Sequence, residues 1–388
     1  MVEHRFLRPL DVLYLRGNRL FGGPGDHGEA LMPPWPSMAA GALRSRMLVD
    51  GVTDLAAFAD GTAPTGKLGS VLGTPAAPGT FRVVDFTLGR AGKGPTVEPF
   101  RPLPADLVAL PDGTGGVAAV RYLTPTAAKD LPDGVATSFP LANLPLLRAE
   151  QQKKPVTERW LGAKGWNAYL SGRVVEPADL AKDALWQTDP RLGIALDAAA
   201  RTAGDGQIYT TDTVALADGI AFVVAVAGAE GSLPADGLVR LGGDGRAAAV
   251  AICTVEATEP PWERIEKEGR FRIILTTPGI FPDGWRLPGM AEDGTWRGPD
   301  GVTARVVAAA IPRHEVISGW NLADGVPKQA ERVVPVGAVY WLEELKGSTD
   351  GLRRMLTEGL WPLIEAPDEQ RRAEGFNNVV VAAWPQVG

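Results

Sequence analysis

Runs of apolar, β-branched and aromatic residues, separated by turn residues, predict two groups of strands along the chain. The strands predicted in the amino-terminal part are residues 10–15, 192–197, 207–209, 220–226, 238–241 and 247–255. Those predicted in the carboxy-terminal part are residues 270–276, 303–311, 333–342 and 379–384. Residues 51–190 are dense in Gly and Pro and have few periodic runs, which indicates a large irregular insertion of short strands.

Helical spacing of apolar residues occurs at three places. Residues 37–48 begin with Ser37, a suitable N-cap, and carry apolar side chains on one face. Residues 349–360 repeat this pattern and end before a proline, and a further helix is expected near residues 157–170.

Together these elements predict an α+β fold made of two tandem ferredoxin-like (RRM-like) β-α-β-β-α-β domains. The first would span residues 1–258, with the insertion at about 51–190, and the second residues 259–388. In the second domain the pattern does not mark the first helix.

Composition narrows the class of protein. At about 150 residues per domain, 388 residues suggest two or three domains. The single cysteine, Cys253, excludes an internal disulfide and any cysteine-based metal cluster. The longest strongly apolar stretch, residues 219–228, is far shorter than the roughly 18 residues of a membrane span. We therefore expect a cytoplasmic protein that does not bind membranes.

The charge is unevenly distributed. The net charge of −7 argues against a surface that binds nucleic acid all over. Residues 1–48 nevertheless carry six basic and four acidic side chains, and residues 148–166 carry five basic and two acidic ones. Such basic islands either hold an anionic strand on one face or are ordinary solvated surface.

The usual signatures of catalysis are missing. Residues 61–67 spell the start of a phosphate-binding loop, but Leu68 replaces the required hydroxyl residue. His4, His27 and His314 are too scattered for a metal motif, so we predict no metal and no cofactor. His27 lies in a Gly-rich loop where a general base could act on RNA, although a loop histidine that bonds backbone or RNA explains it as well.

Other features suit a single RNA strand. The loop at residues 242–246 combines three glycines with Arg246, so its backbone N–H groups could approach phosphates closely. Trp160, Trp166, Trp320 and Phe376 lie near Lys, Arg, Gly or Asn, as base-stacking residues do, although core packing is the commoner role of such rings.

Taken in order, these segments resemble a family within the RAMP superfamily, the third subunits of type III-B CRISPR (Cmr) effector complexes. The resemblance covers nearly the whole chain except residues 51–190. The motifs that carry it are PLDVLYLR at residues 9–16, PPWPS at 33–37, AGALR at 40–44, LGGDGR at 241–246, TPGIF at 277–281 followed by GW at 284–285, GWN at 319–321, PK at 327–328, VPVGAVY at 334–340 and EGF at 374–376. The chain departs from the family at Asn377, where another glycine is expected, and this argues against a tight grip of phosphate by that loop.

The resemblance implies a noncatalytic subunit that binds the repeat-derived 5′ tag of the guide RNA (crRNA) and indirectly meets target RNA. Its partners would be the large polymerase/cyclase-like Cmr subunit and the backbone RAMP subunits. Residues 199–207 would form a hairpin that enters between guide and target. The residues that the resemblance assigns to RNA are Arg16, Gly22, Gly23, Arg44, Arg46, Arg201, Gly242, Gly243, Gly245, Arg246, Trp320, Asn321, Lys328, Gly375 and Phe376.

Two other functions stay open at this point. One is a RAMP endoribonuclease that processes the guide precursor, with His27 or His4 as general base. The other is a structural scaffold whose Gly-rich loops contact only protein.

Overall fold

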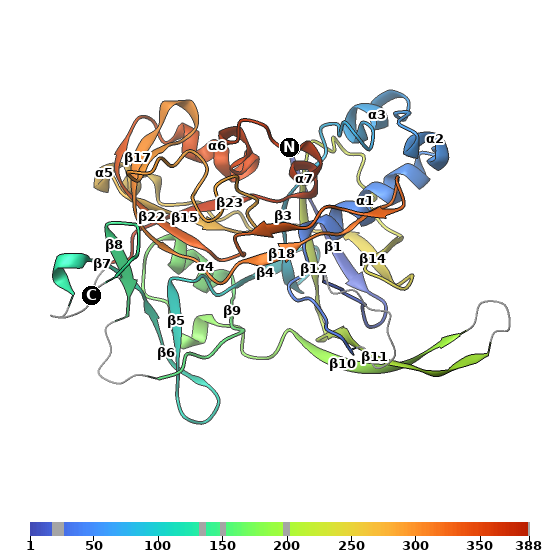
Figure 1. Cartoon of the computed structure of the whole chain (residues 1–388), viewed down its shortest axis with the longest axis horizontal. Helices are drawn as coiled ribbons and strands as arrows, with labels where there is room; N and C mark the ends of the chain where they lie inside the picture. Colours follow the sequence, from blue (N-terminus) through green and yellow to red (C-terminus); the bar gives the residue numbers. More distant parts are fainter. Residues whose placement is uncertain (18–26, 132–136, 148–152, 197–201, 387–388) are drawn as a thin grey trace.

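The computed structural model describes residues 1–17, 27–131, 137–147, 153–196 and 202–386. It combines helices with antiparallel sheets, which confirms that the chain mixes α and β structure. Two large sheets lie next to each other, and a long hairpin extends beyond them (Figure 1). Among the described helices, none is long and apolar enough to cross a membrane.

The first sheet has seven strands in the order β13-β14-β1-β12-β3-β4-β9, and each neighbouring pair is antiparallel. Their bounds are β1 (Val2–Pro9), β3 (Arg82–Ala91), β4 (Val97–Pro102), β9 (Trp160–Leu161), β12 (Ile220–Ala227), β13 (Leu238–Arg240) and β14 (Ala247–Ile252). Every residue of β12 is buried, as expected for a central strand. Helix α1 (Pro36–Asp50) buries Ala40, Leu43 and Met47, the face that the sequence predicts. It begins at Pro36, and its N-cap, Trp35, lies two residues before the predicted cap Ser37, because proline suits the first helical position.

The strand predicted at residues 10–15 is wrong. The first strand is β1, which the charged side chains of Arg5 and Arg8 conceal in the sequence. Arg5 is buried and donates hydrogen bonds to the backbone carbonyls of Leu233 and Pro234. Residues 10–15 form an irregular segment that buries Leu13 and Leu15 but leaves Leu10 exposed. Its one ladder contact is a bridge between Leu13 and Val214.

The second sheet has the order β16-β17-β22-β15-β23, again antiparallel throughout. Its strands are β15 (Phe271–Leu275), β16 (Thr295–Arg297), β17 (Thr303–Ala310), β22 (Val339–Lys346) and β23 (Val379–Ala383), and its helices are α5 (Trp262–Glu268), α6 (Asp350–Glu358) and α7 (Glu369–Glu374). Three strands and α6 agree with the prediction. The strand expected at 333–342 begins later, because the backbone turns at Gly337, where φ is +83°.

In each half, one of the two helical connections of a β-α-β-β-α-β unit lacks its α-helix in the described chain. The described chain has α1 between β1 and β3 but no helix between β12 and β14. Between β15 and β17 it has only the short 3-10 turn η3 (Pro299–Gly301), whereas α6 lies between β22 and β23. Helix α7 packs against both α1 and β3, so a helix of the second half covers part of the first sheet.

The contact between the halves is close at the end of α7. Gly375 has a φ of +95°, and a Cβ atom there would lie 2.8 Å from the carbonyl oxygen of Val83. The side chain of Asn378 donates a hydrogen bond to that same oxygen at 3.2 Å. Glycine is therefore required at residue 375 both by the left-handed backbone and by the neighbouring strand.

The irregular region predicted at 51–190 contains more order than expected. Besides β3, β4 and β9 of the first sheet, its elements are α2 (Leu55–Ala59), α3 (Gly66–Leu72), β5 (Leu107–Pro111), β6 (Val117–Tyr122), β7 (Thr124–Ala127), η1 (Ala128–Asp130), β8 (Asn143–Leu146), α4 (Ala163–Leu170) and η2 (Pro177–Asp179). Helix α3 begins at Gly66, within residues 61–67, and α2 rather than a strand precedes that stretch.

Part of this region packs on the second sheet. Leu107, Trp166 and Tyr169 share one hydrophobic cluster with Ile274 and Trp341 of the second sheet. In Figure 1 the green and cyan segments accordingly lie under the orange and red ones. The inserted region therefore joins the two halves.

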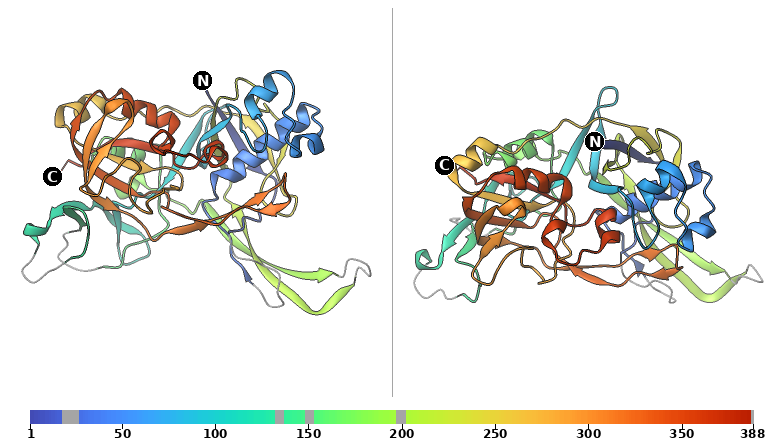
Figure 2. Two further views of the ribbon diagram at one scale, coloured as in Figure 1. Left: turned by 45° about the horizontal axis from the view of Figure 1, so that its top comes forward. Right: turned by 90° about the horizontal axis from the view of Figure 1, so that it is seen from above.

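Two hairpins extend from the sheets (Figure 2). The long hairpin consists of β10 (Trp186–Leu196) and β11 (Ala203–Leu216), with β2 (His27–Gly28) parallel to β11. The turn predicted at residues 204–206 lies within β11. The second hairpin, which we call the arm, spans residues 315–333 and pairs β18 (Glu315–Ile317) with β21 (Glu331–Val333) and β19 (Trp320–Asn321) with β20 (Val326–Pro327).

Candidate nucleic-acid interface

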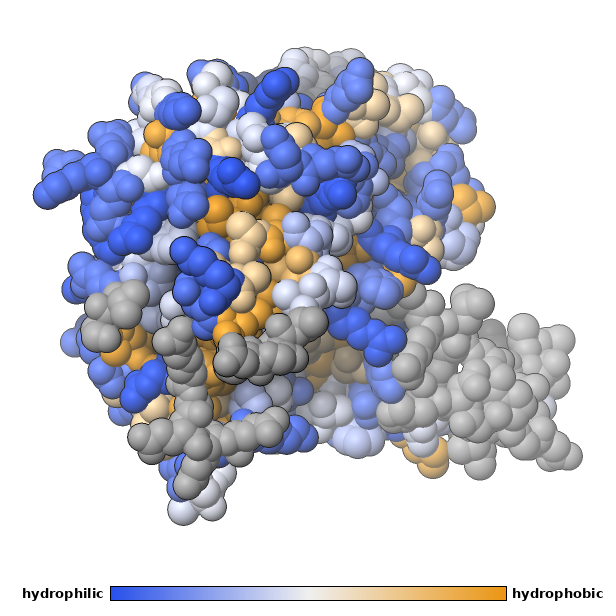
Figure 3. Space-filling model, turned by 60° about the vertical axis from the view of Figure 1, so that its left-hand side comes forward, coloured by the Kyte–Doolittle hydropathy of each residue, from blue (hydrophilic) through white to orange (hydrophobic). Residues whose placement is uncertain are grey.

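RNA binding uses cations and exposed aromatic rings, and not every face of the molecule presents them. On the left-hand side of Figure 1, polar side chains surround a hollow lined by apolar ones (Figure 3). The predicted RNA-binding residues instead fall into two groups, one at the base of the long hairpin and one where α1, α7 and the arm meet.

The first group is built on the glycine loop between β13 and β14. Gly242 has a φ of +80°, and a Cβ atom there would lie 2.8 Å from the carbonyl oxygen of Tyr14. The backbone N–H of Gly243 donates to that same oxygen at 2.8 Å. The loop therefore rests on the segment that contains Tyr14, and within the described chain the backbone N–H groups of Asp244 and Gly245 make no hydrogen bond.

Arg246 reaches from the loop to the same segment. Its Nη1 atom lies 2.5 Å from Oδ2 of Asp11, and its guanidinium carbon lies 5.1 Å from the ring centre of Tyr14. The guanidinium carbon of Arg16 lies 6.0 Å from the same ring centre. The backbone N–H of Val12 lowers the pKa of Asp11, and the charge of Arg246 lowers it further. Arg246 thus pairs with Asp11 and, at 3.9 Å, with Asp244, on a surface that also carries Arg16.

This group lies at the base of the long hairpin. Leu13 and Val214 exchange backbone hydrogen bonds at 2.9 Å, and Arg16 forms a bridge with Ala30. The β10 residue Arg191 is bonded to Asp189 at 2.6 Å and also raises the positive potential near Asp11. Tyr14 lies in the motif PLDVLYLR but is not among the residues predicted to bind RNA.

The two arginines predicted on α1 have different environments. Arg46 donates to the backbone carbonyl of Leu238 at 2.8 Å and to Asp50 at 2.6 Å, so it attaches α1 to β13. Arg44 is half-buried, and no hydrogen bond of its side chain occurs in the described chain. Burial lowers the pKa of Arg44, and the nearby carboxylate of Glu374 opposes this shift. Arg44 is therefore the better placed of the two to bind an added anion.

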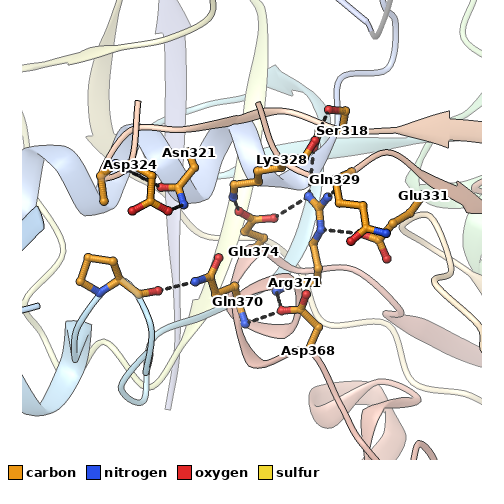
Figure 4. Close-up of polar contacts among 12 residues, drawn as sticks. Ser318, Asn321, Asp324, Lys328, Gln329, Glu331, Asp368, Gln370, Arg371 and Glu374 are labelled. Atoms are coloured by element: carbon orange, nitrogen blue, oxygen red, sulfur yellow. Dashed lines mark hydrogen bonds and ion pairs between the residues drawn. The ribbon is translucent and has the colours of Figure 1, made fainter. Parts of the chain in front are cut away.

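The second group surrounds Glu374 (Figure 4). Lys328 of the arm forms an ion pair with Glu374, and Arg371 binds Glu374 at 3.2 Å from the other side. Arg371 also binds Glu331 at 2.9 Å and the backbone carbonyls of Ser318 and Gln329. Lys328 is thus engaged within the chain and is not a free cation.

The tip of the arm carries the other two predicted residues. Trp320 is 56% exposed. Asn321 holds the turn, since its side chain donates to Asp324 at 2.5 Å and accepts from the backbone N–H of Ala323 at 3.1 Å.

Three predicted stacking rings are buried, which corrects the prediction for them. Trp160 and Trp166 lie in the core. Phe376 is fully buried beside Trp361, whose Nε1 donates to the carbonyl oxygen of Phe376 at 2.7 Å. These rings offer no face to a base, because they fill the contact between elements. Gly375, next to Phe376, joins α7 to β3 as described above.

Asn377 takes the place of the glycine expected from the family. Its φ is +62°, a conformation that asparagine tolerates better than most residues. Its side-chain oxygen accepts from the backbone N–H of Ile280 at 2.5 Å, and its Nδ2 donates to the carbonyl oxygen of Ile280 at 3.2 Å. Asn377 therefore adopts the left-handed backbone conformation of this position, and its side chain also holds the loop that contains Ile280.

The remaining candidates are placed in part. Gly22, Gly23 and Arg201 lie outside the described residues. The backbone of His27 lies in β2, next to β11. His4 lies in the middle of β1, where burial lowers its pKa.

Comparison with known proteins gives one family match. The sequence model of the family described as CRISPR-associated protein (Cas_Cmr3) matches residues 5–384. A comparison with curated proteins found no match.

Chains of solved structures are also similar. One comes from a cryo-EM structure of the Type III-B Cmr-beta bound to cognate target RNA, with 14% identity, a TM-score of 0.48, and coverage of 97% of this chain and 96% of that one. Another comes from the same assembly with target RNA and AMPPnP, with 14% identity, a TM-score of 0.47, and coverage of 95% and 91%. Because the family model spans almost the whole length, the chain belongs to the Cas_Cmr3 family of CRISPR-associated proteins.

Proposed function

We propose that this protein is a noncatalytic RNA-binding subunit of a type III-B CRISPR-Cas (Cmr) antiviral effector complex. It holds the repeat-derived 5′ tag of the crRNA, meets target RNA indirectly, and docks to the large polymerase/cyclase-like subunit next to the backbone RAMP subunits. The observation that carries the proposal is the convergence of Tyr14, Arg16, Arg246 and the glycine loop at the base of the long hairpin.

The chemistry of this group suits a single RNA strand. Proteins bind such strands with cations for the phosphates and with aromatic or guanidinium planes for the bases. Arg16 and Arg246 supply two cations, and both lie near the ring of Tyr14. The backbone N–H groups of Asp244 and Gly245 add donors for phosphate oxygens. Arg44 would extend the path along α1.

We also infer that the chain is a tandem of two ferredoxin-like units, each short of one helix. The orders β14-β1-β12-β3 and β23-β15-β22-β17 both place the fourth strand beside the first and the third beside the second, as in that fold. Helix α7 packs on α1 and β3, and in this way it replaces the second helix that the first unit lacks.

Replacing Arg246 with alanine should weaken binding of the tag RNA by the assembled complex and make it less dependent on salt. One lost phosphate contact reduces the slope of log affinity against log salt by about one unit. The measurement is a binding titration at several salt concentrations with an RNA that carries the repeat-derived 5′ end.

Asp11→Asn is the matched control, because it removes the nearer of the two carboxylates that pair with Arg246 but keeps the cation. We expect its affinity to equal or exceed that of the unchanged protein. An Arg246→Ala variant with an unchanged slope and affinity would remove Arg246 from the interface.

The endoribonuclease alternative predicts cleavage of a repeat-containing RNA that depends on His27 or His4. We expect no cleavage by the unchanged protein, by His27→Ala or by His4→Ala, measured on labelled precursor RNA. Cleavage by the unchanged protein that either variant loses would favour the enzyme. A pure scaffold would instead give no crosslinks to RNA at the glycine loop.

A further inference from the structure

The tip of the arm is chemically unlike an RNA-binding surface. Its residues 319–327 contain one charged side chain, Asp324, and no cation. The nearest cation along the arm, Lys328, is already paired with Glu374. A phosphate backbone would therefore meet a negative charge and no positive partner from this segment.

The same tip exposes large apolar side chains. Trp320, Leu322 and Val326 are 56%, 76% and 47% exposed, all within seven residues. Interface centres are rich in aromatic side chains and poor in lysine, and tryptophan is a frequent energetic centre of such contacts.

The arm is held in one orientation before any partner arrives. Arg371 binds Glu331 and two backbone carbonyls of the arm. Across the arm, Ser318 Oγ donates to the carbonyl oxygen of Lys328 at 2.8 Å, and the N–H of Lys328 donates to that of Gly319 at 2.9 Å. A segment ordered in this way loses little conformational entropy on association.

We propose that the tip of the arm, residues 319–327, is a protein-docking element that inserts Trp320 and Leu322 into an apolar groove of a neighbouring subunit. The single charge at Asp324 fits a groove that carries basic side chains at its rim. The inference rests on the proposed membership of a multisubunit complex. It assigns Trp320 to protein contact in place of base stacking.

The test places the photocrosslinking residue benzoylphenylalanine at position 322 of the full chain. The complex is purified from cells, irradiated and digested, and the adducts are identified by mass spectrometry. We expect peptides of one other protein chain to be attached at position 322. The control carries the same residue at position 52, where Val52 is 91% exposed on the surface next to α1, and should not yield that peptide.

The outcomes separate the two proposals. Adducts with nucleotides, adducts within the same chain alone, or no adduct in a complex that still contains crRNA would overturn the docking inference and leave the proposed function standing. Recovery of the chain without RNA and without other subunits would overturn both.

Two variants report on the chemistry of the contact. Trp320→Ala should weaken retention of the crosslinked subunit by about tenfold or more, as expected for a central aromatic residue. Asp324→Asn keeps an acceptor for Asn321 but removes the charge, so it should weaken retention at low salt and not at high salt. Retention that neither substitution changes would exclude the tip from the contact.

Discussion

Replacement of Asp106 with alanine is expected to lower the free energy of unfolding by about 3–5 kcal/mol, because it leaves the charge of Arg272 buried without its partner. Asp106 and Arg272 are both fully buried and form an ion pair between the inserted region and the second sheet. Arg272 also donates to the backbone carbonyls of Ala383 at 2.9 Å and Tyr169 at 2.8 Å. The measurement is denaturant unfolding followed by tryptophan fluorescence.

Two further variants identify the cause of the loss. Tyr169→Phe removes the hydroxyl that donates to Asp106 at 2.8 Å and should cost only about 1 kcal/mol. Asp106→Leu combined with Arg272→Met removes both charges and should recover most of the stability. A loss below about 1 kcal/mol in Asp106→Ala would mean that the ion pair does not hold the halves together.

Replacement of Arg371 with alanine should release the arm. Arg371 is buried, binds the carboxylates of Glu331 and Glu374, and donates to two carbonyls of the arm. Its loss leaves these groups without their shared cation, at an expected cost of about 3 kcal/mol. Amide hydrogen exchange should become at least about tenfold faster in residues 315–333, while the second sheet stays protected.

The neighbouring Arg372 provides the control. Its side chain is partly exposed and meets only Glu369, at 3.4 Å, among the ion pairs of the described residues. Arg372→Ala should therefore cost less than about 1 kcal/mol and leave exchange in the arm unchanged. Equal exchange in both variants would show that Arg371 does not fix the arm.

Local sequence patterns predicted the elements whose apolar residues are close together in the sequence. Helix α1 and the strands β12, β15 and β23 were found because their apolar residues are clustered and uninterrupted. Strand β3 was missed inside the irregular region, since it includes Asp85, Gly89 and Arg90. Its side chains satisfy both the core and the ion pair of Asp85 with Arg101, which no local pattern reveals.

The candidate interface could be predicted only to the level of motifs. The glycine loop and the segment of Tyr14 were both recognised, but their contact joins residues far apart in the chain. Whether a cation is free also depends on distant partners. Lys328 and Arg46 were equivalent to Arg44 in the sequence, yet Glu374 and the backbone of β13 engage the first two.

The ion pair between the halves also sets an order of events during synthesis. Asp106 precedes Arg272 by 166 residues. At about 5–20 residues per second, roughly 10 to 30 s separate the appearance of the two side chains on the ribosome. Until Arg272 and the second sheet are made, the apolar side chains of α4 and its neighbours that pack on that sheet stay uncovered. The nascent chain is thus most exposed to aggregation while the arm and the second sheet are still untranslated, and chaperone binding should be concentrated in this interval.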